Sequence, residues 1–374
     1  MDLDTQCIPL GHIQTYFDLR KSIEYELDWL ERRVRFPDEN VQAHQGIIEL
    51  ITGIDQATFY RQAGIPHAPG VVDAFITPRQ VLALVDQAVN ALKMPYLGLA
   101  MGGLMTATHH GMAGLAAVTQ PSLRGCLDAI RRFYGELFPV LDMEGVPGEK
   151  GEDARFIMRE VISMAPYTHY FMELNMVSFY NIFKHLVNGD HELTSVDFNY
   201  PEPPWSNIYR RYFQCPVRFN QPVTCLRGPA ELEHYELPMA NRLMAMNAER
   251  TLFENIPTRA IRLLPLRLRR LLTRCYGAFP SVEDAASELG MSSRTLRRRL
   301  VEEGTSYMHE LDTVREQFAR EYFDRGGQSV TEIAMTLGFS DSSAFAKAFR
   351  RWTGLSPSGY QENRRTSGVT PSSI

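Results

Sequence analysis

The chain has 374 residues, of which 44% are hydrophobic and 10% aromatic, a composition typical of a globular protein with two domains. A formal net charge of −5 would argue against nucleic-acid binding if it were evenly spread. However, residues 259–374 carry 18 Lys and Arg against 13 Asp and Glu, which leaves the preceding part strongly acidic. This asymmetry indicates a basic nucleic-acid reader joined to a separate, acidic control domain.

Cysteine usage and the N-terminus bear on the compartment. The five cysteines, Cys7, Cys126, Cys215, Cys225 and Cys275, are scattered and include no C-x-x-C pair, which favours a reducing compartment over a disulfide framework or zinc ribbon. The chain begins without a basic stretch or an apolar run, and the weakly polar segment 97–118 is rich in glycine. We therefore expect a cytoplasmic protein with no membrane span.

The first 255 residues combine helical and strand patterns. In chain order, helices are expected at 12–33, within 41–62, from Thr77-Pro78 to 92, from 120–123 to 137, and at 170–186. Short strands are expected at 153–164, 193–200, 216–219 and 223–227, where β-branched and aromatic residues recur. The pattern predicts an α+β fold for residues 1–255, which we interpret as a ligand-sensing and oligomerisation domain.

The boundary to the second domain is predicted near Pro257. A helix at 238–255 precedes residues 256–262, which form the best linker, and a basic helix at 266–276 opens the next domain. Residues 263–365 are expected to form that domain, and residues 366–374 a flexible tail.

One short pattern occurs twice within residues 281–357. Ser281 begins a run that is repeated from Ser329: a serine, an acid three residues later, a small residue mid-helix, and then Gly290 or Gly338. Serine and acid predict a capping box, and the glycine predicts a left-handed helix end. Ser292 or Ser293 in the first copy, and Ser340 or Asp341 in the second, can cap the next helix. Each copy is therefore a helix-turn-helix.

The second helix of each copy has a buried and a basic face. Leu296 and Leu300, and in the second copy Phe345 and Phe349, are four residues apart and predict the buried face. The outward face of the first copy carries Arg294, Arg297, Arg298 and Arg299, and that of the second carries Ser342, Ser343, Ala346, Lys347, Arg350 and Arg351. Arginine pairs with guanine edges and neutralises phosphates, so these faces indicate double-stranded DNA as the partner.

Residues 263–365 resemble the DNA-binding domain of the AraC/XylS family of transcription regulators. The resemblance rests on the run from Leu337 to Phe345 and the run from Phe349 to Pro357, followed by Tyr360. It implies an all-α domain with two helix-turn-helix units, joined by a linker helix over 306–325. That helix would span about 30 Å at 1.5 Å per residue, close to the roughly 34 Å between successive major-groove faces.

The family motif implies which residues touch DNA. Base contacts would fall on Arg294, Arg297, Arg298, Ser342, Ser343, Ala346 and Lys347. Arg350 and Arg351 form the basic end of the second helix, and Ser356 with Pro357 would begin a final helix whose free N–H groups can hold a phosphate. Ala346 departs from a polar base reader, so the second helix is expected to discriminate less between bases.

The N-terminal part resembles the arabinose-binding-like effector domain of one AraC subfamily. The resemblance implies a small-molecule effector, with activation through RNA polymerase as the usual output, and a homodimer is compatible with it. The aromatic residues Tyr167, His169, Tyr170, Phe171, Phe179, Tyr180 and Phe183 could line an apolar cavity, but such a stripe is more often core. The effector and its binding residues therefore stay open.

Catalytic and metal chemistry is not indicated. The sequence contains no G-x-S-x-G elbow, no phosphate-binding loop and no zinc-ligand spacing, and the adjacent His109 and His110 would point apart on a helix. No cofactor is expected. The function that we predict is an effector-responsive DNA-binding regulator. The alternatives are a constitutive DNA-binding protein whose N-terminal domain only dimerises or binds a protein, and an enzyme with a DNA-binding tail.

Overall fold

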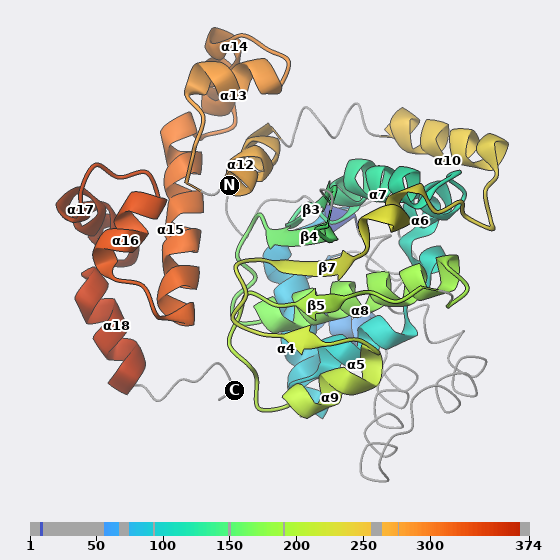
Figure 1. The fold of residues 1–374 in the computed structure, drawn as a ribbon. Coiled ribbons are helices and arrows are strands. Elements are labelled where there is room, and N and C mark those ends of the chain that lie inside the picture. Colours follow the sequence, from blue (N-terminus) through green and yellow to red (C-terminus); the bar gives the residue numbers. More distant parts are fainter. Residues whose placement is uncertain are drawn as a thin grey trace.

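The computed structural model describes residues 8–9, 56–66, 75–92, 94–148, 151–189, 191–255, 264–275 and 277–366. The helix expected at 12–33, the linker at 256–262 and nearly all of the tail at 366–374 lie outside these residues. An α+β body is followed by an all-α body, as the sequence predicted (Figure 1).

A five-stranded sheet forms the centre of the N-terminal domain. The strands, in spatial order, are β3 (Leu141–Val146), β4 (Ala154–Glu160), β7 (Thr224–Gly228), β5 (Ser195–Asp197) and β6 (Val217–Arg218). Neighbours are antiparallel except β5 and β6, which are parallel. A further pair joins β1 (Ile8–Pro9) to β2 (Phe75–Ile76). The strands expected at 153–164 and 193–200 are shorter than predicted, and β3 was missed because acidic residues alternate with its apolar ones.

Helix α8 (Thr168–Leu186) lies at the centre of the domain, with 13 buried residues. The other described helices of the domain are α3 (Gln56–Gln62), α4 (Pro78–Leu92), α5 (Leu97–Leu104), α6 (Gly111–Val118), α7 (Leu123–Leu137), α9 (Ser206–Tyr212) and α10 (Arg242–Asn255), with 3₁₀ turns η1 (Ala107–His110) and η2 (Ala230–His234). Thr77 caps α4, as predicted, because its hydroxyl accepts a hydrogen bond from the Gln80 N–H at 3.1 Å.

Glycine lets α5 lie directly against α8. A Cβ on Gly98 would stand 2.4 Å from the Tyr170 carbonyl oxygen, and one on Gly102 would stand 2.4 Å from that of Leu174. A larger residue at either position would therefore push the two helices apart. Gly111 is an exception, since it has a φ of +59° and open space around its Cβ position, so it serves a turn.

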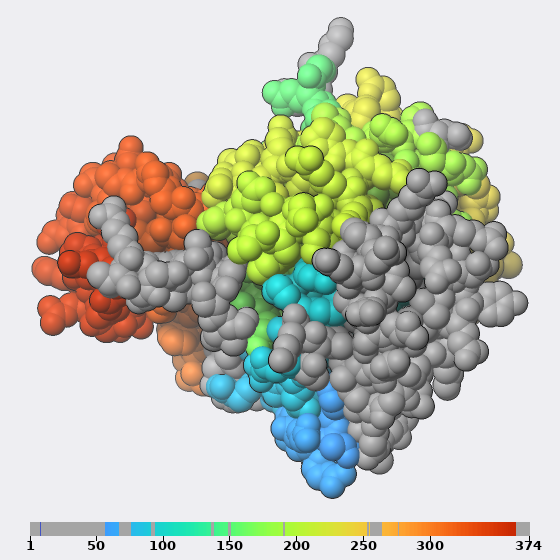
Figure 2. Space-filling view, turned by 90° about the horizontal axis from the view of Figure 1, so that it is seen from below, coloured from blue at the N-terminus to red at the C-terminus, as the bar shows by residue number. Residues whose placement is uncertain are grey.

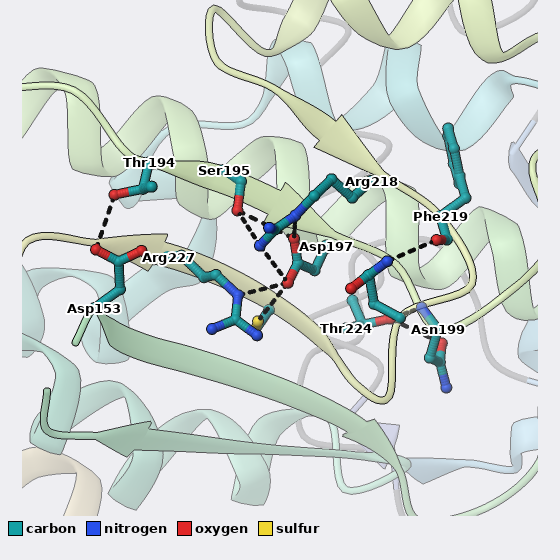
Figure 3. Close-up of polar contacts among 11 residues, drawn as sticks. Asp153, Thr194, Ser195, Asp197, Asn199, Arg218, Phe219, Thr224 and Arg227 are labelled. Carbon is teal, nitrogen blue, oxygen red and sulfur yellow. Dashed lines mark hydrogen bonds and ion pairs between the residues drawn. The ribbon is translucent and has the colours of Figure 1, made fainter.

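A buried carboxylate on β5 links this strand to its two neighbours, β6 and β7. Asp197 is fully buried and accepts hydrogen bonds from Arg218 at 2.8 and 3.0 Å and from Arg227 at 2.5 Å (Figure 3). Burial would raise the pKa of Asp197, but the hydrogen bonds from Arg218 and Arg227 outweigh it and hold that pKa below its usual value. Both arginines keep part of their surface in water, which limits the cost of burying the charge.

The C-terminal domain consists of seven helices in the described residues. They are α12 (Leu264–Arg274), α13 (Val282–Glu288), α14 (Ser293–Glu302), α15 (Tyr307–Arg325), α16 (Val330–Thr336), α17 (Ser342–Thr353) and α18 (Pro357–Thr366). Leu311, Val314, Phe318 and Tyr322 of the predicted linker helix are buried in their shared core, but Met308 is 56% exposed. Met308 lies on the first turn of α15.

Helix α12 belongs to both domains. Leu266 is buried in the core of the N-terminal domain, whereas Leu264, Leu268 and Leu272 are buried in that of the C-terminal domain. At the end of the helix, Arg274 donates two hydrogen bonds of 2.7 Å to the carboxylate of Asp142 in β3, which is 2% exposed. The helix therefore fixes the second domain to the edge of the sheet.

Helix α15 makes a second contact with the N-terminal domain. Gln317 donates a hydrogen bond to the Glu160 carbonyl at 3.1 Å, and Asn199 donates one to the Glu321 carboxylate at 3.4 Å. Further along, Arg325 reaches the carbonyls of Gln221 and Pro222 at 3.4 Å each. The side chains of α15 that face the sheet are thus polar, and the two domains meet through hydrogen bonds there.

We expect the stability of the folded chain to fall as the pH rises through neutrality. Burial, reinforced by the nearby Glu321, raises the pKa of Glu160 from 4.5 to about 8, so the fold favours the protonated acid. Its contribution is fully present below about pH 4.5 and is lost as the pH approaches about 8. The Glu160→Gln variant stays neutral at every pH. Between pH 5 and pH 8 its free energy of unfolding should therefore fall by about 3 kcal/mol less than that of the wild type, and the thermal unfolding midpoint, measured at each pH, reports this difference.

The control for this experiment is Glu231→Gln, which changes an exposed acid on η2. It should keep the pH dependence of the wild type. An unchanged pH dependence in Glu160→Gln would show that this carboxyl is not protonated in the fold.

Candidate nucleic-acid interface

The first helix-turn-helix is closed by the hydrogen bonds that its sequence predicts. The Ser281 hydroxyl accepts the Asp284 N–H at 3.1 Å, and the Asp284 carboxylate accepts the Ser281 N–H at 3.3 Å, so the capping box is complete. Gly290 then takes a φ of +74°, which ends α13 and turns the chain. Ser292, rather than Ser293, caps α14 by accepting the Thr295 N–H at 3.2 Å.

The second helix-turn-helix repeats this geometry. The Ser329 hydroxyl accepts the Glu332 N–H at 3.2 Å, and the Glu332 carboxylate accepts the Ser329 N–H at 2.7 Å, which lowers the pKa of Glu332. Gly338 has a φ of +73°. Asp341, rather than Ser340, caps α17, since its carboxylate accepts the Ala344 N–H at 2.8 Å.

The buried faces of α14 and α17 are the predicted ones. Leu296, Leu300, Phe345 and Phe349 are each 0% exposed. Ala286 and Ala334, at 1% and 0%, lie where the first helix of each unit is crossed by the second. Packing of this side onto the core leaves the opposite side of each helix to solvent.

The predicted base-reading residues of α14 all lie on that opposite side. Arg294, Arg297 and Arg298 are exposed, and Arg299 is half-buried. Arg297 lies 3.1 Å from Glu283 and Arg298 lies 2.6 Å from Glu302, in ion pairs whose side chains are more than half exposed. Such exposed pairs contribute little, so the guanidinium groups are available to a stronger anion.

The predicted residues of α17 are brought together in the same way. Ser343, Lys347, Arg350 and Arg351 are exposed, whereas Ser342 and Ala346 are half-buried. Arg351 pairs with Asp312 of α15 at 2.6 Å. This helix presents one lysine, hydroxyls and a methyl group at its start and two arginines near its end. The face is less basic than that of α14 until its last turn.

Ser356 caps the last helix. It is exposed, and its hydroxyl accepts the Gly359 N–H at 3.1 Å, which makes it the predicted N-cap of α18. Pro357 is the first helical residue and lacks the N–H that would otherwise be unpaired.

Helix α15 connects the two units, and its 19 residues span about 28 Å. Arg315 fixes the second unit to it, because its guanidinium donates to the Leu337 carbonyl at 3.0 Å and lies 4.7 Å from the centre of the Phe339 ring. A buried ion pair between Arg269 and Glu310 joins α15 to α12, which shares a core with the first unit. These contacts were not predicted, since no local sequence pattern marks an arginine whose partner lies in a turn or a helix far along the chain.

The space-filling view shows the C-terminal domain, in orange and red, as a lobe beside the yellow-green N-terminal domain (Figure 2). The contacts between the domains come from α12 and α15. None of the hydrogen bonds or ion pairs found in the described residues joins an exposed side chain of α14 or α17 to the N-terminal domain. Among the described residues, the polar side chains on the outer faces of α14 and α17 are thus exposed or half-buried and make no such bond to the N-terminal domain.

The aromatic residues considered for an effector site divide between two environments. Phe171, Phe179, Tyr180 and Phe183 are buried in the main core, as the core interpretation predicted, and Tyr167, His169 and Tyr170 are half-buried around it. Phe179 and Phe183 also line a cavity beneath the sheet. The seven residues do not converge on one site.

The paired histidines have packing roles. The His110 ring lies 2.9 Å from the Ser178 hydroxyl, and His109 forms the capping box of η1 with Thr106. Across the described ranges, no three His, Cys, Asp or Glu side chains gather as metal ligands. No helix in those ranges is long and apolar enough to cross a membrane.

Family models match both domains. Residues 53–237 match the "Arabinose-binding domain of AraC transcription regulator, N-term", and residues 285–363 match a "Helix-turn-helix domain". The ornithine utilization regulator of Pseudomonas aeruginosa is 34% identical over 72% of this chain and 79% of its own. The HTH-type transcriptional regulator VirS of Mycobacterium tuberculosis is 26% identical over 84% of this chain and 93% of its own.

A solved structure also aligns over most of the chain. The transcriptional regulator CdpR from Pseudomonas aeruginosa has 24% identity, with coverage of 87% of this chain and 99% of that one and a TM-score of 0.43. The assignment to a family rests on the family models and on the relatives found by sequence. This chain belongs to the AraC family of transcriptional regulators and combines an arabinose-binding-type effector domain with a helix-turn-helix DNA-binding domain.

Proposed function

We propose that this regulator binds one face of double-stranded DNA by placing α14 and α17 in two successive major-groove turns. The observation that carries the proposal is the pair of exposed faces on α14 and α17, two helices that the single helix α15 connects. Helix α17 packs along α15, because Phe323 contacts Phe345 and Phe349 and Asp312 pairs with Arg351. One chain therefore holds both helices on the same linker helix.

The chemistry of the two faces assigns different roles to them. Arg294, Arg297 and Arg298 on α14 would read bases, because a guanidinium can donate two hydrogen bonds to guanine. On α17, base contacts would come from Ser342, Ser343, Ala346 and Lys347, and the remaining predicted residues, Arg350, Arg351 and Ser356, would hold phosphates. Most of the discrimination between sequences should come from α14.

We further infer that an effector bound to the N-terminal domain controls this reader, with activation through RNA polymerase as the output and a homodimer as the assembly. Since the target is DNA, we place its action in the cytoplasm. Because one relative is an ornithine utilization regulator, ornithine is one compound to test, and its binding would argue against an apolar effector. A constitutive binder with a purely dimerising N-terminal domain is the competing function, and it predicts that no metabolite changes the affinity for DNA.

Selection of bound sequences from a random duplex pool by the full-length protein, at a stated salt concentration, tests the DNA proposal. We expect enriched sites with two short boxes one helical turn apart. A single enriched box would contradict the use of both helices, and no enrichment in any effector condition would contradict sequence-specific binding.

Arg297→Ala should weaken binding to the selected site by about 1–3 kcal/mol and relax the preference at one base pair, because a bidentate base contact is lost. Fluorescence anisotropy with the selected duplex and its single-base variants measures both effects. The control is Arg210→Ala, which removes an exposed arginine from α9 of the N-terminal domain and should leave both unchanged. Unaltered affinity and preference in Arg297→Ala would refute the placement of α14.

Arg350→Ala should weaken binding to specific and random duplexes alike, because a phosphate contact carries no sequence information. The slope of log affinity against log salt should fall by about 0.9 for the one phosphate released. Titrations at four salt concentrations measure this slope. A loss confined to the selected site would instead make Arg350 a base-reading residue.

A further inference from the structure

We propose that the effector of this regulator is an uncharged, apolar small molecule, and that it binds in the cavity between α7, α8 and the β3–β4–β7 face of the sheet. This inference rests on the proposed effector control and names the chemical class of the ligand. It depends on the lining of one cavity and on the elements that form its walls.

The cavity has a volume of about 70 Å³ and is bounded by three elements. Its deep walls are apolar and come from α7 and α8, with Phe156 and Leu226 from the sheet, and they include Cys126, Ile130, Phe179, Ile182 and Phe183. Burial raises the pKa of the Cys126 thiol to about 12, so this side chain is neutral as well. An apolar ligand would lose little by leaving water for such a lining.

Small residues in the sheet create the space. Gly145, Ala154 and Gly228 lie on three adjacent strands, with Gly145 opposite Phe156 and Ala154 opposite Gly228. These positions share the face that is turned toward α7 and α8. At Gly145 the nearest side chain to a Cβ would be Leu127 at 3.8 Å, so space is left there, whereas Gly228 gives room to Leu193 and Leu232, which also line the cavity. Gly145 and Pro229 are exposed, which places the mouth of the cavity between them.

Charged ligands do not suit this lining. Arg155 is also a neighbour, but strand alternation directs its side chain to the opposite face from Phe156. The carboxylate of Glu233, at the rim, is already held by Arg124 at 2.7 Å. An ammonium or carboxylate inside the cavity would therefore lose its hydration without gaining a free counter-ion.

The walls of the cavity are also the elements that hold the reader. The carbonyl of Gly135, on α7, accepts a hydrogen bond from Arg270 of α12 at 2.7 Å. Asp142, on β3, holds Arg274 of the same helix. A ligand that displaces α7 or β3 thus also displaces α12. Since α12 is part of the DNA-binding domain, binding in this cavity can change the position of that domain.

Three probes with the same six-carbon chain test the ligand class in the full-length protein: 1-hexanol, hexanoate and hexylammonium at pH 7. We expect 1-hexanol to raise the thermal unfolding midpoint and to bind at least about tenfold more tightly than either ion, as measured by calorimetry. Equal binding of all three probes, binding only of an ion, or binding of none would overturn the proposal.

A graded series at Gly145 tests the place of binding. A Cβ there would lie 3.8 Å from Leu127, an ordinary contact, so Gly145→Ala should fold and keep the hexanol response. Gly145→Leu extends a larger side chain across the mouth and should weaken hexanol binding by at least about tenfold. Leu127→Ala, which widens the cavity, should shift the preference toward 1-octanol. A full hexanol response in Gly145→Leu would place the ligand elsewhere.

Failure of this inference is separable from failure of the proposed function. The duplex selection requires no ligand-binding result, so enriched two-box sites with no hexanol binding would overturn the apolar effector alone. Loss of sequence selection, with hexanol binding intact, would overturn the DNA proposal alone.

Discussion

A buried carboxylate on the edge strand, Asp142, determines where the DNA-binding domain begins. At 2% exposure it needs a partner, because an unpaired buried carboxylate costs several kcal/mol. Its partner Arg274 is the last residue of α12 and donates two hydrogen bonds of 2.7 Å to it. The helix cannot slide or rotate without breaking them. Since Arg269 of α12 is paired with Glu310 of α15, the position of the linker helix follows from that of β3.

The two helix-turn-helix units are fixed to α15 by different chemistry, and this makes them one body. The first is held by the core that α12 shares with Leu296 and Leu300, and the second by Arg315, which binds the turn carbonyl of Leu337. The relative position of α14 and α17 is therefore set by packed helices. We infer that control acts on the orientation or assembly of the whole reader and leaves the spacing of its two halves unchanged.

Local signals explain what the sequence could predict. The serine and acid of each capping box, the glycine of each turn, and Thr77 before Pro78 act within four residues, and the structure places each of them as expected. The buried faces of α14 and α17 could be predicted from their apolar residues, and the basic faces are the opposite sides of the same helices. For the candidate site, sequence reasoning thus found the exposed residues of α14 and α17.

Long-range pairing explains what the sequence could not predict. Arg274 and Asp142 are 132 residues apart, and Arg269 and Glu310 are 41 apart, so no spacing rule connects them. Strand β3 was missed because Asp142 looks like a solvent-facing residue until α12 covers it. The cavity depends on the cross-strand register of Gly145, Ala154 and Gly228, which a single sequence does not reveal.

An effector can control this reader only by binding one arrangement of the two domains more tightly than another. Protein interiors are densely packed, so a ligand that outgrows a cavity of about 70 Å³ must move a wall. The movable walls are α7 and β3, because α8 is buried on nearly every side. Their hydrogen bonds to Arg270 and Arg274 would then be strained or re-formed in a new position. The free energy of ligand binding in the cavity would thereby be coupled directly to the position of α12 against α7 and β3.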